Sequence, residues 1–178
     1  GLSWDGGIPV GIESATQADP VVIGATAHGF SDGDNVRIEG VVGMEDLNAN
    51  VYTVANKTTD TFELSGVDGT GYEAYVSGGT VQKVEMNFGG LDHLEGEDVA
   101  VLADGLALAN ETVSSGSIEL DGYYNVVHVG LPVTSILFPM RIEGGATSGT
   151  AQGQTKRIDK LTVRFHETIG GKWGPSDD

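Results

Sequence analysis

One stretch of the sequence concentrates the side chains that metal binding or acid–base catalysis would use. GLDHLEGEDVAVLADG, residues 90–105, holds one histidine and five carboxylates. A zinc or iron site on His93 would need further ligands at workable spacing, but His93 has no HxH or HxxxH partner. The neighbouring acids are Asp92, Glu95, Glu97 and Asp98, and the other histidines, which are scattered, are His28, His128 and His166.

A structural interpretation explains the same stretch better. Leu91 and Leu94 would point inward from one tight turn, Gly96 would end that turn, and the acids would face water. Residues 98–105 would then form a strand that closes in a hairpin tip at Asp104-Gly105, a strong turn signal. We therefore expect a turn, a strand and a hairpin tip here.

A second short pattern is half of a calcium loop. SDGDN, residues 31–35, offers Asp32 and Asp34 as oxygen ligands. An EF-hand loop needs oxygen ligands at positions 1, 3 and 5 and a glutamate at position 12. The fifth position here is Val36 and the twelfth is Gly43, so the EF-hand pattern fails. A weak surface calcium site formed with neighbouring acids stays open as an alternative.

Other catalytic and binding patterns are weak. No G-x-S-x-G and no GxxxxGK[ST] occurs, and Ser115 lacks the flanking residues of a nucleophile elbow. A glycosidase needs two positioned carboxylates, and no pair stands out among the 26 acids. Aromatic residues that could stack on a sugar more often belong to a core or an interface; they are Trp4, Tyr123, Tyr124 and Trp173. We expect no catalytic residue, no cofactor and no metal ligand.

The composition predicts the fold class. Of the 178 residues, 39% are hydrophobic, which is enough for a buried core. Short Val/Thr/Ile/Tyr runs between the 28 glycines predict an all-β chain with many turns. The chain has no cysteine, which excludes disulfides, thiolate metal sites and cysteine nucleophiles.

The net charge of −17 excludes some partners. Nine Lys and Arg residues against 26 acids argue against nucleic-acid binding. Six of the nine cations lie after residue 140, so opposite charges could help neighbouring copies to meet. No apolar run approaches the roughly 18 residues of a membrane span, and the first ten residues lack the features of a signal peptide. The chain starts without methionine, and we expect a fragment of a longer protein.

Strands must position these residues. We expect a strand at residues 2–5 that Gly6-Gly7 ends, and further strands at 35–40, 50–55, 61–66, 78–84 and 98–105. Later features are two strands around Asp121-Gly122, a buried apolar run at 131–140, a long loop at 144–154 and an amphipathic strand within 156–168. In that last strand Leu161, Val163 and Phe165 share one face, and Thr162, Arg164 and His166 share the other.

Several stretches resemble a known family. GLSWDGG near the start, GLDHLEGEDVAVLADG, VVHVGLP (126–132) and GTAQGQTKRIDKLTVRFHETIGGKWGP (149–175) together resemble the tail tubular or nozzle-type structural proteins of tailed bacteriophages, short-tailed ones especially. The motifs occur in the family's order and make up about a third of the chain. In that family the segment like LSWDGG runs almost directly into the one like LDHLEG. Residues 11–84 therefore resemble an insertion.

The insertion resembles another module. PVVIGATAHGFSDGDNVRIEGV, VYTVANKTTDTFELSG and GGTVQKV are similar to the small β-barrel first described as the first catalytic cysteine half-domain of ubiquitin-activating enzymes. Without a cysteine, this chain cannot form a thioester. The expected fold is all-β, with a discontinuous β-sandwich-like domain (1–10 and 85–178) and an inserted small β-barrel (11–84).

The first resemblance implies a non-enzymatic structural component of a phage or prophage tail: tail tube, nozzle or hub region. Its expected partners are other tail proteins and copies of itself in a ring, with no specific nucleic-acid binding and no membrane span. Its expected location is the virion tail, after assembly in the host cytoplasm. The alternative is a carbohydrate- or cell-surface-binding module whose barrel binds a host surface glycan. An exposed aromatic cluster on the barrel would favour that alternative.

Overall fold

The described residues fold almost entirely into antiparallel β-strands, which confirms the predicted all-β class. The structure is a computed structural model, and it describes residues 1–133, 136 and 162–164. Within them the helical segments are two single 3₁₀ turns, Glu45–Leu47 and Asp92–Leu94. Neither is long or apolar enough to cross a membrane. The chain divides into two compact units, Gly1–Pro132 and Val133–Asp178.

The first of two hydrophobic cores in unit Gly1–Pro132 lies inside a set of strands that we call the barrel (residues 10–84). Its strands pair in the order β8-β5-β6-β7-β4-β3. They are β2 (Val10–Gly11), β3 (Ser14–Ala15), β4 (Val22–Gly24), β5 (Asn35–Val42), β6 (Asn50–Ala55), β7 (Thr61–Leu64) and β8 (Ser77–Gly89). The predicted strands at 35–40, 50–55 and 61–66 are confirmed, with small shifts at their ends, and the one predicted at 78–84 is the first part of the longer β8.

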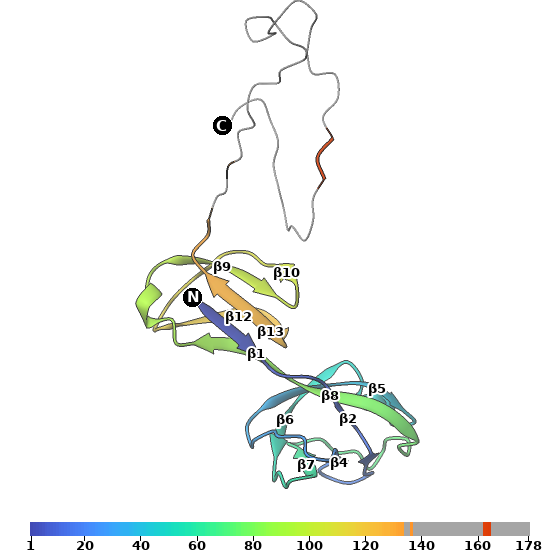
Figure 1. The fold of residues 1–178 in the computed structure, drawn as a ribbon. Coiled ribbons are helices and arrows are strands. Elements are labelled where there is room, and N and C mark those ends of the chain that lie inside the picture. Colours follow the sequence, from blue (N-terminus) through green and yellow to red (C-terminus); the bar gives the residue numbers. More distant parts are fainter. Residues whose placement is uncertain (134–135, 137–161, 165–178) are drawn as a thin grey trace, which may run out of the picture. The chain divides into compact units, whose positions relative to one another are not determined.

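A short segment closes the barrel. In residues 10–15, β2 pairs with β8 through Val10 and Val81, and β3 pairs with β4 through Ala15 and Ile23. This segment therefore joins β8 to β4, the strands at opposite ends of the series β8-β5-β6-β7-β4 (Figure 1). Closure removes the free edges that an open sheet would leave.

Alternating apolar residues fill the barrel. Phe62, Ile23 and Ile38 are fully buried, as are Leu64 and Val81. The period-2 pattern of β5 and β7 directs Ile38, Phe62 and Leu64 inward. Phe62 also meets two buried aromatic rings edge-on, His28 at 5.1 Å and Phe30 at 5.6 Å between ring centroids. Phe62 thus points into the barrel, and Tyr52 is partly buried against the same core.

The second core lies in a set of strands that we call the sandwich (residues 2–5 and 85–130). One sheet has the order β1-β13-β9-β10, with β11 also on β9, and β12 pairs with the last part of β8. The strands are β1 (Leu2–Asp5), β9 (Asp98–Ala103), β10 (Leu106–Ala107), β11 (Glu111–Thr112), β12 (Ser117–Tyr124) and β13 (Val126–Gly130). The N-terminal strand thus lies beside residues far along the chain (Figure 1).

Strand β8 belongs to both cores. Its first residues pair with β5 up to Val84, and its last residues, from Glu85, pair with β12. Val84 and Phe88 on this strand are both buried, and Phe88 belongs to the sandwich core. The predicted boundary at residue 84 therefore falls inside one continuous strand. The part of the predicted second domain after residue 136 lies outside the described residues, apart from 162–164, and stays a prediction.

Two local predictions need correction. The two strands expected within 117–130 are present as β12 and β13, but Asp121-Gly122 does not separate them. It lies inside β12 at an irregular register, and the chain reverses at Asn125, where it passes from β12, paired with β8, to β13, paired with β9. The run 131–140 was expected to be buried, but its described large apolar residues, Leu131, Val133 and Ile136, are exposed. The predicted loop at 144–154 and most of the strand within 156–168 lie outside the described residues.

The barrel core makes a direct prediction. Phe62→Ala removes a fully buried ring from β7, which lies between β4 and β6. We expect the free energy of unfolding, measured by urea denaturation, to fall by about 3–5 kcal/mol. Ile8→Ala is the control because Ile8 is 86% exposed, and it should change stability by less than about 0.5 kcal/mol. Equal effects of the two substitutions would contradict this assignment of the core.

Candidate functional site

The acidic stretch 90–105 holds turns together. Both oxygens of Glu95 accept backbone hydrogen bonds, from Ser115 N–H at 3.0 Å and Gly116 N–H at 2.8 Å. Ser115 and Gly116 have φ of 54° and 68°, so this carboxylate stabilises a left-handed turn. Asp98 accepts the Thr112 hydroxyl at 2.7 Å, which ties β9 to β11.

The predicted architecture of this stretch is confirmed. Leu91 and Leu94 are buried, and Gly96 has a positive φ of 78° at the end of the turn. Asp104-Gly105 forms the tip between β9 and β10, with φ of 47° and 79°. The five acids are exposed, as expected, and three of them, Glu95, Asp98 and Asp104, also accept hydrogen bonds from the protein.

Within the described residues, His93 does not belong to a set of metal ligands. Its Nε2 atom lies 3.4 Å from the amino nitrogen of Gly1. Across the part of the chain that the structure describes, no group of three or more His, Asp or Glu side chains could hold a metal ion. The arrangement around His93 therefore offers no geometry for metal binding in this part of the chain.

The two aspartates of SDGDN stabilise a loop of the barrel. Asp32 accepts the Lys57 N–H at 2.9 Å. Asp34 accepts the Ser31 N–H at 2.9 Å and forms an ion pair with Lys83 at 2.8 Å. The side chains of Lys83 and Asp34 are 34% and 17% exposed, so the pair contributes at most about 1 kcal/mol. Both carboxylates already accept hydrogen bonds from the protein, so a turn explains the partial calcium-loop pattern.

Among the described residues, Trp4 and Tyr124, two candidates for sugar stacking, lie in different surroundings. Trp4 is partly buried against the sandwich core and meets Phe88 edge-on, with 5.4 Å between ring centroids. The Tyr124 hydroxyl donates to Asp121 at 3.2 Å, and burial and that carboxylate raise the pKa of Tyr124. Trp173 lies outside the described residues.

An acidic depression opens on the barrel surface. It is lined by Gly43, Glu45, Asp46 and Glu73. The Tyr52 hydroxyl donates to the Asp46 carbonyl at 3.3 Å, and burial raises the pKa of Tyr52 above 10.0. Its lining thus consists of three carboxylates and one glycine.

The best-organised polar constellation joins the barrel to the sandwich, and Asn125 is at its centre. The Asn125 side-chain amide donates to the carbonyls of Lys83 at 2.8 Å and Gly7 at 3.3 Å. Its backbone N–H donates to the Asp104 carboxylate at 3.1 Å, and its carbonyl accepts the Gly6 N–H at 2.8 Å. Asn125 is only 9% exposed, so these bonds replace water that the residue has lost.

Further contacts support this junction. Asp104 also accepts the Val126 N–H at 2.7 Å, which fixes the start of β13. Arg37 of the barrel donates to the Tyr123 carbonyl of the sandwich at 2.7 Å.

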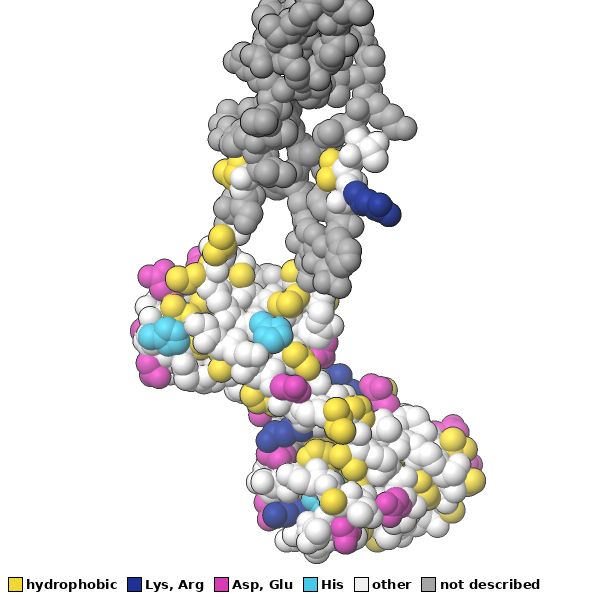
Figure 2. All heavy atoms as spheres, viewed as in Figure 1, with side chains coloured by type: hydrophobic (Ala, Val, Ile, Leu, Met, Phe, Trp, Pro, Cys, Tyr) yellow, Lys and Arg dark blue, Asp and Glu magenta, His cyan; other side chains and the backbone are white. Residues whose placement is uncertain are grey.

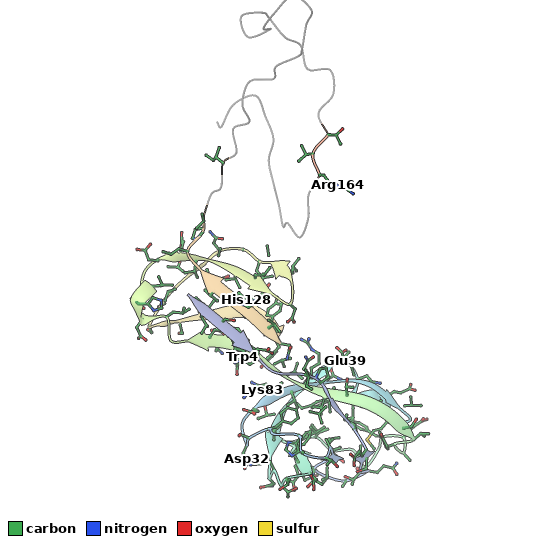
Figure 3. The ribbon with its side chains drawn as sticks, viewed as in Figure 1. Trp4, Asp32, Glu39, Lys83, His128 and Arg164 are labelled. Atoms are coloured by element: carbon green, nitrogen blue, oxygen red, sulfur yellow. The ribbon has the colours of Figure 1, made fainter. Side chains whose placement is uncertain are left out.

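A Cβ atom at Gly6 would collide with the Lys83 carbonyl oxygen, so glycine is required there. Lys83 is labelled on β8 in Figure 3. No local sequence signal pointed to Asn125, because its partners lie up to 118 residues away.

Comparison with known proteins agrees with the barrel. Residues 21–85 match the family model of the ubiquitin-activating enzyme E1 FCCH domain. The second resemblance is therefore supported. The match covers less than half of the chain, and the chain contains no cysteine that could form a thioester. A search of curated proteins finds no match to the chain.

The junction predicts a stability effect. Asn125→Ala leaves the Lys83 carbonyl without its donor, and we expect the free energy of unfolding to fall by about 1–3 kcal/mol. Asn125→Asp keeps the size but removes the donor, and should cost at least as much. Asn110→Ala is the matched control because Asn110 is exposed. Urea denaturation measures all three, and an Asn125→Ala protein as stable as the wild type would contradict the role.

Tyr52 predicts a pH dependence. Its raised pKa means that the folded protein holds the phenol proton more tightly than the unfolded chain. This contribution to stability is present below pH 10.0 and is lost as the pH rises through the folded pKa. Between about pH 9 and pH 11, the wild type should lose stability relative to Tyr52→Phe. Denaturation curves at each pH give this difference, and a constant difference would refute the assignment.

Proposed function

We propose that this chain is a non-enzymatic structural component of a phage or prophage tail that acts through protein–protein contacts. The sequence resemblance to tail tubular and nozzle-type proteins supports the proposal, and three of its four stretches fall on described strands and turns of the sandwich. The observation that best supports the proposal is the hydrogen bonding within the stretch 90–105. The side chains there that suggested chemistry, Glu95, Asp98 and Asp104, bind turns and neighbouring strands instead.

The acidic surface suggests how the chain would work in a tail. Residues 1–140 contain 21 acids and three cations, and Figure 2 shows acidic side chains spread over the visible face of the described residues. In a ring of copies around a tail axis, acids that line the channel would repel passing DNA. Different surfaces of neighbouring copies would meet in heterologous contacts that close the ring.

The glycan-binding alternative lacks the feature that would favour it. Each aromatic side chain of the barrel is at least partly buried; these are Phe30, Tyr52, Phe62, Tyr72 and Tyr75. The Tyr75 hydroxyl, for example, donates to the Ile12 carbonyl at 2.8 Å. Sugar binding usually needs an exposed aromatic face for stacking. The structural role is therefore the better-supported proposal.

Immunogold electron microscopy tests this proposal. Particles induced from the source would be labelled with antibody raised against this chain. We expect gold at the tail or its tip, and antibody absorbed beforehand with the purified chain should remove the label. Intact particles without label would contradict a virion role, and a glycan screen would then test the alternative.

A further inference from the structure

The sandwich ends in a strand with a free edge. Within the described residues, β1 is the end strand of its sheet and pairs only with β13. In the described part of the chain the backbone groups on its other side have no strand partner, and such an edge is a template for another strand. The inward side chains of β1, Leu2 and Trp4, are only partly buried against the core. Figure 3 labels Trp4 on β1 and His128 on the neighbouring β13.

A segment with a matching pattern lies late in the sequence. Leu161, Val163 and Phe165 alternate with the polar residues Thr162 and Arg164. The described part of this segment, residues 162–164, is exposed and belongs to no strand. Val163 is 47% exposed. An apolar series of period 2 with an exposed member indicates a strand whose apolar face needs a partner.

The apolar residues of β1 and of residues 161–165 can lie on the same face whether the added strand is parallel or antiparallel to β1. On β1, Leu2 and Trp4 alternate with the exposed residues Ser3 and Asp5. Because side chains alternate between faces, an added strand can place all three apolar residues of 161–165 beside Leu2 and Trp4. Arg164 then lies on the outer face with Asp5, where opposite charges attract. The added apolar side chains would complete the cover over the partly buried core residues.

The charges of the chain favour contact between its late basic segment and the acidic unit of a second copy. Residues 1–132 carry 21 acids and three cations, so the units of two copies repel each other. Residues 141–172 carry six cations and three acids. A basic segment that approaches the acidic unit of a neighbour offsets this repulsion.

We propose that residues 161–165 of one copy add as a strand to the free edge of β1 in a second copy. Donor and acceptor are different surfaces, so each copy can give one strand and receive another, and the contact is heterologous. This inference rests on the proposed function for its setting, a ring of copies, and it deepens that function by naming the contact. Self-association of the purified chain tests the contact separately from the location of the chain in a particle.

Sedimentation equilibrium of the purified chain is the first measurement. The wild type should associate as its concentration rises, more weakly at high salt because the contact is partly electrostatic. Hydrogen exchange of the β1 amides that face away from β13 should slow in the associated state. Val163→Asp places a charge on the apolar face of the added strand, and should weaken association about tenfold or more.

Matched variants separate this contact from general effects of charge. Val76→Asp makes the same change at a barrel residue that is 69% exposed, and should leave association unchanged. Arg164→Glu should weaken association, whereas Lys57→Glu, at an exposed barrel lysine, should not. Circular dichroism of each variant should match that of the wild type, which shows that the fold is kept.

Three results would overturn the inference. The first is a wild type that stays monomeric at every concentration with fast-exchanging β1 edge amides. The second is a monomer with protected edge amides, because the segment would then pair within its own chain. The third is association that Val163→Asp and Arg164→Glu leave unchanged. If one of these results is obtained and antibody still labels the tail, the proposed function stands and only this contact is ruled out.

Discussion

The buried amide of Asn125 is the constraint on which the arrangement of the described residues depends. It binds carbonyls of the loop at Gly7 and of β8 at Lys83, while its backbone is held by Asp104 and Gly6. Four segments that are far apart in the sequence therefore meet at one residue. A buried amide without partners is costly, so each of these segments must keep its place for the others to be stable.

Carboxylates perform the same task elsewhere in the molecule. Glu95 holds the turn at Ser115 and Gly116, and Asp60 accepts the N–H of Ala27, whose φ is 52°. Turns with left-handed residues expose backbone amides that strands cannot satisfy, and an acidic side chain supplies the acceptor. Part of the acidic composition is thus architectural. The remaining acids cover the surface, which fits a protein that works through contacts with its neighbours.

Local patterns predicted local structure well, and long-range pairing poorly. The hairpin tip at Asp104-Gly105 and the turn around Leu91 and Leu94 follow from neighbouring residues, and both are confirmed. Asp121-Gly122 carries the same dipeptide signal, but the pairing of β12 with β8 overrides it. The role of Asn125 left no local signal, since an asparagine before an apolar strand is ordinary. Its importance comes from partners that only the folded topology brings together.

The central claim is that this chain works as a repeated structural part of a tail, through surfaces rather than through a reaction. Electron cryomicroscopy of particles induced from the source tests this most directly. The account predicts density for the barrel and the sandwich repeated around the tail axis, with neighbouring copies in heterologous contact. A tail map of comparable detail in which every density is explained by other proteins would contradict it.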